Sequence, residues 1–522
     1  MKPRGLIYFI TPFFLFLSAC MVGPNYKEPT KKVASHWIKK DKYIKESSFR
    51  NANWWKVFND PTLTALIYQG YQHNLSLHRA AVHVLRTRAQ LAQSVGQFFP
   101  QQQLMTGNLT YQRIGGQSLE FVLPSSFNTA LMGFSASWEL DFWGKYRRAI
   151  LSRDASFYAS YAAYDNALVT LTSDIASTYI AIRTTERLIE VTKKNIKVQA
   201  YSLKLAAARH RAGETSLLDV EQAQTVLSQT QSNLPPLASN LQQQKDMLGV
   251  LLGTTPDQVD CFLTGKHGAI PKAPSSVAVG IPKETLMKRP DIYQSRMEVI
   301  AQSERIGAIK ANLYPAISLT GTFAFAANDI GQSSLSDLFS WSNRTISAGP
   351  SFNWPLLNYG QITNAVREQD AVFQEALLNY LDLTLKAQQE VQDNITQFIE
   401  MKKSEGYLIT ANGAATKATK LSLVRYKEGQ SDFTPVLNSE TQQLKVETSL
   451  ATAQGDVPKA LVALYRSLGG GWQIRGCNDI VPRQIEKEMA KRTNWGTLLQ
   501  QKNHQPPNTG QQRIEELYLP NW

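Results

Sequence analysis

Apolar residues recur at every seventh position in one long stretch of the chain, within residues 144–253. The positions are Leu168, Ile175, Ile182, Ile189, Ile196 and Leu203. A seven-residue apolar period is typical of a helix that packs against other helices in a coiled coil. Gly213 interrupts the stretch, and a glycine lets the chain end one helix and reverse direction. The pattern therefore predicts a long helical hairpin over residues 145–252.

The glycines that bound and divide this hairpin recur about 216 positions further along the chain. The counterparts of Gly144, Gly213 and Gly253 are Gly360, Gly429 and Gly469. Regular spacing of this kind is the signature of an internal repeat. We therefore interpret the chain as a tandem duplication. Its parts are repeat 1 (residues 62–255), a Pro-rich linker (256–282) and repeat 2 (283–472), whose long hairpin spans 361–468.

Each repeat opens with a shorter helical stretch, which is predicted over residues 63–99 and again from Lys283, and which stops at a proline. The period then changes to two. Apolar and polar residues alternate in Met132-Gly133-Phe134-Ser135-Ala136-Ser137-Trp138, as expected for a strand with one apolar and one polar face. Four such strands are predicted, near residues 103–112, 130–142, 316–326 and 345–356.

Amphipathic strands have two interpretations. They can form a soluble sheet with one face in water, or a membrane barrel whose apolar face meets lipid. Here Trp138 and Trp354 lie near strand ends, and the polar face is small and uncharged over most of its length. Together with the export signal described below, these features favour strands that face lipid.

Four strands are too few to close a barrel. An open sheet edge in hydrocarbon leaves backbone groups unpaired, at several kcal/mol each. We therefore expect a homotrimer, because three copies would supply about twelve strands, an even number within the range of outer-membrane barrels. The first helix of the hairpin, about 67 residues long, would extend roughly 100 Å. The predicted fold is an α+β membrane protein: a trimeric barrel of four transmembrane strands per subunit, continued by an α-barrel of long antiparallel coiled-coil helices.

The amino terminus has the layout of an export signal. Lys2 and Arg4 precede an apolar run over residues 6–17, which is too short to span a bilayer. The run ends in Leu17-Ser18-Ala19-Cys20, which resembles a bacterial lipobox. The motif implies cleavage of residues 1–19 and acylation of Cys20, including palmitate, and Met21 in place of Asp favours sorting to the outer membrane. Residues 20–61 are predicted to form a lipidated, extended segment.

The remaining features of the sequence argue against three classes of function: nucleic-acid binding, catalysis and metal binding. The formal net charge is +13 at pH 7, but the basic residues are scattered among acidic ones and form no cluster. No nucleic-acid partner is therefore expected. The sequence contains no phosphate-binding or nucleophile-elbow motif, which argues against an enzyme. Cysteine and histidine spacings do not suit a metal, so no metal and no cofactor besides the lipid on Cys20 is predicted. Cys261 and Cys477 stand 216 positions apart, and two alternatives remain open: a disulfide that joins the repeat ends, or two free thiols.

Three stretches resemble a known family. They are Cys20-Met21-Val22-Gly23-Pro24-Asn25-Tyr26-Lys27-Glu28-Pro29, then Trp54-Trp55 with Phe58 and Asp60-Pro61, and then Arg289-Pro290-Asp291-Ile292 with Tyr314-Pro315-Ala316-Ile317-Ser318-Leu319. They are similar to the lipoprotein branch of the outer-membrane factors, the TolC-like exit ducts of tripartite efflux pumps and type I secretion systems. The resemblance covers about residues 20–472. It implies a trimeric barrel, an α-helical barrel, a mixed equatorial collar and a narrowed periplasmic tip.

The resemblance places both hairpin turns at that tip. It implies contact with a periplasmic adaptor, the membrane fusion protein, through Arg209, Gly213, Glu214, Thr215, Leu217, Arg425, Gly429, Asp432 and Phe433. It implies a tip aperture lined by Asp219, Asp432 and Asn438, although Asn438 stands where family members commonly carry an acidic residue. The simpler alternative is that the glycines only reverse the chain, and that the carboxylates are solvated groups at helix starts.

The sequence therefore predicts a passive, trimeric exit duct for drugs or other small molecules across the periplasm and outer membrane. Its expected partners are the adaptor, a proton-driven inner-membrane pump and outer-membrane lipid. Two alternatives are an exit duct for type I protein secretion and a non-conducting structural coiled-coil lipoprotein. Residues 473–522 are predicted to be a loosely packed tail.

Overall fold

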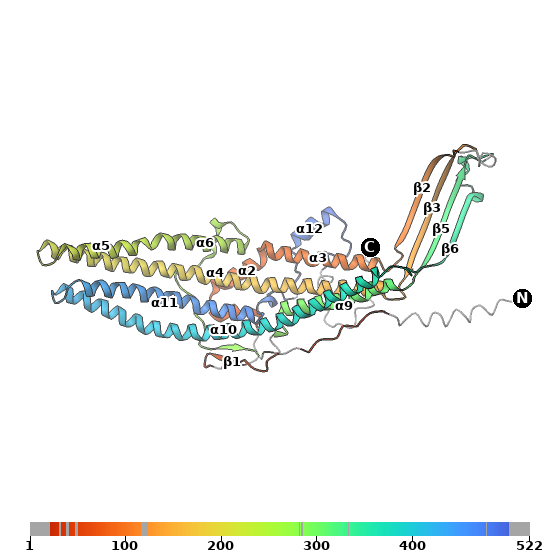
Figure 1. The fold of residues 1–522 in the computed structure, drawn as a ribbon. Coiled ribbons are helices and arrows are strands. Elements are labelled where there is room, and N and C mark those ends of the chain that lie inside the picture. Colours follow the sequence, from red (N-terminus) through yellow and green to blue (C-terminus); the bar gives the residue numbers. More distant parts are fainter. Residues whose placement is uncertain are drawn as a thin grey trace.

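The protein is an elongated body of long helices with a four-stranded sheet at one end (Figure 1). The computed structural model describes residues 21–30, 33–37, 41–46, 51–115, 124–280, 282, 286–331, 333–476 and 478–500. The predicted signal peptide, Cys20, Cys477 and the end of the predicted tail lie outside the described residues.

Two helices of equal length form the body. Helix α4 (Lys145–Arg211) and helix α10 (Gln361–Lys427) each contain 67 residues. Each begins after a glycine with positive φ, +76° at Gly144 and +82° at Gly360, a backbone conformation that other residues rarely adopt. The return helices are α5 (Leu217–Ser232) and α6 (Leu234–Leu252) in the first hairpin and α11 (Thr434–Ser467) in the second.

The first hairpin packs α4 against α5 and α6, the second packs α10 against α11, and α4 also contacts α11. The first return is divided at Asn233, whereas α11 is one helix. Pro235 and Pro236 follow the break, and a proline lacks the N–H that would continue the hydrogen-bond ladder of α5.

The helix predicted over residues 63–99 is two helices, α2 (Pro61–His73) and α3 (Leu75–Gly96). Asn74 separates them because its side chain caps α3, accepting a 2.8 Å hydrogen bond from the Leu77 N–H. Its amide also donates to the Leu251 carbonyl at 2.9 Å and so ties the break to α6. In the second half the helix before the strands is α9 (Pro290–Lys310), and the predicted start at Lys283 lies outside the described residues.

The sheet consists of β2 (Gln102–Arg113), β3 (Ser126–Leu140), β5 (Ala316–Asn328) and β6 (Arg344–Asn353), antiparallel and in that order. Each predicted strand corresponds to one of these, with ends shifted by a few residues. Phe134 pairs with Met105 on one side and with Phe323 on the other, so these apolar side chains share a face. Phe134 is 58% exposed in the subunit. Within the described chain, β2 and β6 each have one unpaired edge.

Short elements surround the long helices, in a region that we call the collar, or lie in loops next to the strands (Figure 1). They are β1 (Ile44–Glu46), paired in parallel with β4 (Val277–Val279), helices α7 (Val259–Phe262) and α12 (Arg483–Arg492), and 3-10 turns η1 (Asn51–Phe58), η2 (Pro256–Gln258), η3 (Ala311–Leu313), η4 (Leu335–Asp337), η5 (Trp341–Asn343) and η6 (Trp472–Arg475). The collar core contains Trp54, which is buried and stacks on Tyr465 of α11 with ring centroids 5.4 Å apart. None of the described helices is both long and apolar enough to cross a membrane.

The predicted heptad seam holds only in the half of α4 nearer the sheet. Leu168, Ile175 and Ile182 are fully buried, but the later members of the heptad are only half-buried. Toward the tip the buried positions shift by one residue, to Asn195 and Ser202. Asn195 and Ser202 are hydrogen-bonded to Glu447 and Glu440 of α11, so packing against that helix selects the buried side of α4 here. The contact toward the tip is therefore polar.

Close packing of α11 on α4 in the collar predicts opposite effects for one substitution at two glycines. A Cβ at Gly455 of α11 would lie 2.1 Å from the Thr184 hydroxyl, whereas a Cβ at Gly413 of α10 would meet no atom within 4 Å. We expect Gly455→Ala to destabilise the protein by about 1–3 kcal/mol. Gly413→Ala should stabilise it by about 0.5–1 kcal/mol, because alanine favours the helix. Urea unfolding followed by circular dichroism measures both, and equal effects would contradict this packing.

Candidate functional site

The two hairpin turns lie at the end of the molecule opposite the sheet (Figure 1). Gly213 and Gly429 have φ of +76° and +74°. The Glu214 N–H donates to the Arg209 carbonyl at 3.0 Å, and the Gln430 N–H donates to the Arg425 carbonyl at 2.9 Å. Both turns therefore close their helices in the same way. The glycines are needed for positive φ, because a Cβ at Gly213 would have open space around it.

One cluster joins the two hairpins near their ends. The Arg209 guanidinium lies over the Tyr426 ring, 4.7 Å from its centroid, and donates to the Tyr426 carbonyl. The Tyr426 hydroxyl donates to the Asp219 carboxylate at 3.3 Å. Phe433 packs edge-on against Tyr426 at 5.2 Å. Two residues of the first hairpin and two of the second are thus held together, and burial raises the pKa of Tyr426.

The remaining tip residues differ in how far their side chains are exposed. Phe433 is 1% exposed, so in this conformation its side chain supports the tip cluster. Thr215 is half-buried beside the first turn. The other residues predicted to contact an adaptor, all exposed, are Gly213, Glu214, Leu217, Arg425, Gly429 and Asp432. Adaptor contact stays a prediction.

The three residues predicted at the aperture differ in environment. Asp432 and Asn438 are exposed, whereas Asp219 is half-buried and bonded to Tyr426. Sequence reasoning missed Tyr426. The available signal was an aromatic residue three positions before the turn glycine, but no repeat partner supported it, because its counterpart is His210.

A second group of polar residues lies between α4 and α11 and was also missed. We call Asn195, Gln199, Ser202, Glu440, Gln443 and Glu447, all buried, the polar seam. The Ser202 hydroxyl donates to the Glu440 carboxylate. The Asn195 amide donates to Glu447 at 2.7 Å. Gln199 is 2% exposed, and both polar atoms of its amide lack a partner among the described residues. A buried amide without partners weakens a contact.

The two glutamates of the polar seam differ in electrostatics. Burial raises the pKa of Glu440, and the hydrogen bond from Ser202 offsets this only in part. Burial also acts to raise the pKa of Glu447, but hydrogen bonds from Gln443, Lys194 and Asn195 outweigh it and lower the pKa. Lys194 forms a 2.9 Å ion pair with Glu447. Of the two carboxylates, Glu440 therefore keeps its proton to the higher pH.

At the sheet end, the N-terminal segment lies across the junction of strands and helices. The Val22 N–H donates to the Trp143 carbonyl at 3.0 Å. Arg148, which is buried, forms a 2.6 Å ion pair with Glu304 and donates to the Asn25 side chain at 2.8 Å. The first described residues are thus fixed where β3 ends and α4 begins.

Other predicted sites are less defined. Cys261 is exposed and is bonded to no described cysteine, while Cys477 lies outside the described residues, so the disulfide stays a prediction. Among the described residues no three His, Cys, Asp or Glu side chains form a metal-binding group.

The sequence matches the family model described as outer membrane efflux protein, over residues 66–254 and again over 281–470. The chain belongs to the outer membrane efflux protein family. The match confirms the resemblance found in the sequence, and the members of this family are efflux channels of the outer membrane rather than enzymes. Its two segments correspond closely to the two repeats that we infer.

Individual relatives agree with this assignment. The chain is 26% identical over 466 residues to nodulation protein T of Rhizobium leguminosarum bv. trifolii, covering 89% of this chain and 97% of the relative. It is 25% identical to the outer membrane protein OprJ of Pseudomonas aeruginosa, covering 88% and 94%. Among solved structures, the outer-membrane channel OprN is similar with a TM-score of 0.80 and 28% identity, covering 87% of this chain and 100% of that one.

The polar seam predicts opposite pH effects for two matched substitutions. Because the pKa of Glu440 is raised on folding, its protonation stabilises the fold fully below the ordinary pKa of glutamate, and this stabilisation is lost as pH rises through the raised value. Glu440→Gln should therefore stabilise the protein at about pH 8 and have little effect at about pH 4.

Glu447 should show the opposite pH dependence, because its pKa is lowered on folding. Its ionised carboxylate stabilises the fold above the ordinary pKa of glutamate, and this stabilisation is lost as pH falls through the lowered value. Glu447→Gln should destabilise the protein at about pH 8 by roughly 1–3 kcal/mol. Urea unfolding at both pH values tests the pair. Destabilisation by Glu440→Gln at the higher pH would show that this carboxylate is stabilised as an anion.

The tip cluster predicts a local effect of one hydroxyl. Tyr426→Phe keeps the ring over Arg209 but removes the hydrogen bond to Asp219, which contributes about 0.5–1.5 kcal/mol. Hydrogen exchange of the amides in residues 209–219 should rise by up to about tenfold. Tyr407→Phe, at an exposed position of α10, is the control and should change nothing. Unaltered exchange in Tyr426→Phe would show that the hydroxyl does not link the hairpins.

Proposed function

We propose that three copies of this chain assemble into a tube that passes small molecules outward across the periplasm and outer membrane. The observation that carries this proposal is the sheet: four amphipathic strands with an exposed apolar face and two unpaired edges. Neighbouring subunits would pair β2 with β6 and so remove every edge from hydrocarbon. The 67-residue helices would continue the tube into the periplasm, over roughly 100 Å.

The same geometry supports a lipid anchor. Cys20 would directly precede Met21 and Val22, which lie against Trp143 and Gly144 at the base of the sheet. Acyl chains on Cys20 would therefore enter the bilayer beside the barrel, and each buried methylene contributes about 0.8 kcal/mol.

The tips are the proposed contact with the rest of an efflux system. They lie farthest from the membrane end, and their exposed residues would meet a periplasmic adaptor linked to a proton-driven inner-membrane pump. The pump would supply the energy, because the sequence has no nucleotide-binding motif. The relative OprJ carries the name of an outer membrane protein, and other relatives are named as solvent and toluene efflux pump components, which favours small apolar or amphipathic cargo.

The two faces of the sheet supply a test with matched variants. Phe134 belongs to the face that would meet lipid, and the adjacent Ser135 belongs to the polar face. Phe134→Lys should cost about 2–4 kcal/mol near the bilayer midplane and abolish assembly, whereas Ser135→Lys should be tolerated.

The measurement is the susceptibility of a deletion strain to dyes, detergents and antibiotics. We expect wild type and Ser135→Lys to restore resistance, and Phe134→Lys to fail. Unchanged susceptibility of the deletion strain with loss of a secreted protein would support type I secretion instead. Unchanged susceptibility and secretion, with both lysine variants assembling normally, would contradict a duct and favour a structural lipoprotein.

A further inference from the structure

We propose that a basic pocket between α4 and α9 forms an anion-binding station on the inner wall of the tube and makes the duct favour anionic cargo. The proposal rests on the function proposed above and adds a class of substrate to it: molecules that carry a phosphate, carboxylate or sulfonate group.

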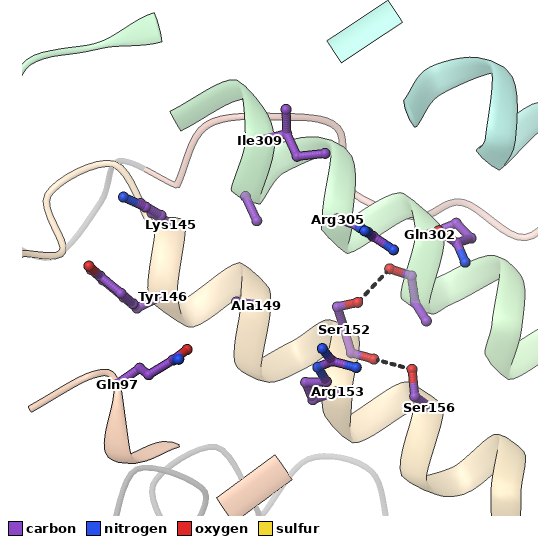
Figure 2. A pocket seen from close by; sticks show the side chains of 12 residues that line it. Gln97, Lys145, Tyr146, Ala149, Ser152, Arg153, Ser156, Gln302, Arg305 and Ile309 are labelled. Carbon is purple, nitrogen blue, oxygen red and sulfur yellow. Dashed lines mark hydrogen bonds between the residues drawn. The ribbon is translucent and has the colours of Figure 1, made fainter. Parts of the chain in front are cut away.

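The pocket lies just below the sheet and has a volume of about 320 Å³ (Figure 2). Its polar lining includes Arg153 and Ser152 of α4 and Arg305 and Gln302 of α9. The Ser152 hydroxyl donates to the Ala301 carbonyl at 2.9 Å, so a hydrogen bond joins the two helices beside the arginines. Among the residues that line it are three cations and no carboxylate.

The charges of Arg153 and Arg305 are not neutralised within the subunit. Both side chains are exposed and form no ion pair with a described residue. Neighbouring cations differ in this respect: Lys145 is bound to Glu139 at 3.0 Å, and Arg147 to Asp141 at 2.9 Å. Two like charges that face one hollow repel each other until an anion lies between them. Guanidinium groups also match the paired oxygens of phosphate, carboxylate and sulfonate.

The position of the N-terminal segment indicates which side of the wall the pocket occupies. That segment contacts Arg148 of α4 and Gly307 of α9, and Cys20 must reach lipid from the same side. Successive residues of a helix turn by about 100°, so Arg153 points about 140° away from Arg148, and Arg305 about 160° away from Gly307. The pocket therefore faces away from the lipid side.

The sheet independently indicates that the pocket faces the interior of the tube. Glu139 alternates with Phe134 and Trp138 along β3, so it lies on the polar face that would line the barrel interior. Tyr146 donates to Glu139 at 3.0 Å, and both Tyr146 and Lys145 line the pocket. The polar face of the sheet is thus continuous with the pocket.

The polar face of the sheet, which lies above the pocket, carries few charges that could oppose the two arginines. On the polar face of the described strands, Glu139 is the only ionisable residue, and Lys145 pairs with it. The barrel interior would carry little net charge of its own. Two unpaired guanidinium groups per subunit, repeated by threefold assembly, would form a basic ring directly below it. Rings of arginine or lysine make a pore selective for anions.

The experiment measures ion selectivity of the purified full-length protein in planar bilayers under a tenfold KCl gradient. The double variant Arg153→Gln with Arg305→Gln removes the ring, and Arg492→Gln, on the remote helix α12, removes an exposed charge elsewhere. From the reversal potentials we expect the chloride to potassium permeability ratio to fall by roughly threefold or more in the double variant. The ratio should not change in Arg492→Gln.

A second measurement uses inorganic phosphate as the probe. Phosphate added to one chamber should reduce the chloride current through the wild type at lower concentrations than through the double variant. Conductance with the same selectivity and the same phosphate effect in wild type and double variant would overturn the anion station while leaving the duct intact. No current through the wild type would contradict the duct itself, and the station with it.

Discussion

The unpaired edges of β2 and β6 are the constraint on which the rest of this structure depends. Backbone N–H and C=O groups without partners are tolerated in water but not in hydrocarbon. The sheet exposes its apolar face, including Phe134 and Ile346, as a membrane strand would. A subunit with such a sheet needs neighbours before it can enter a bilayer. In the proposed tube, assembly, membrane insertion and the formation of a lumen would all follow from this one requirement.

The contacts between the long helices divide into an apolar part and a polar part. In the collar, α4 packs through Leu168, Ile175 and Ile182, and a buried aromatic cluster around Trp54 holds the surrounding elements. Toward the tip, the contact between α4 and α11 is the polar seam, in which burial raises the pKa of Glu440 and the Gln199 amide has no partner among the described residues. The contact between the helices is thus apolar nearer the sheet and polar toward the turns. Among the described residues, the small tip cluster around Tyr426 links the two hairpins again beyond the polar seam.

Much of this fold is predictable from sequence because it repeats simple periods. The alternation around Phe134 places a strand, and the glycines at 144, 213 and 253 bound the first hairpin within a residue or two. The break at Asn74 was missed because the apolar pattern continues through it, while one side-chain cap decides the conformation. Toward the tip the buried positions of α4 were assigned one residue away, because packing against α11 selects them and α11 is distant from α4 in the sequence.

The candidate sites are harder to predict from the sequence than the fold, because they depend on contacts between segments that are distant in the chain. Arg209 and Asp219 could be singled out because they flank a turn, and their predicted roles stay predictions. Tyr426 lies 207 positions from Asp219, and its contact with Asp219 forms only once the hairpins pack together. Arg153 and Arg305 were likewise two unremarkable cations among many. Their common pocket, and the absence of a carboxylate partner for either among the described residues, are properties of the packed helices α4 and α9.

The central claim is that the subunit completes its sheet with neighbours, and native mass spectrometry of the detergent-solubilised, membrane-extracted protein tests it most directly. The account predicts a particle with three times the mass of one mature chain, with the strand content preserved in circular dichroism spectra of the same sample. A particle with the mass of one chain and undiminished strand content would contradict it.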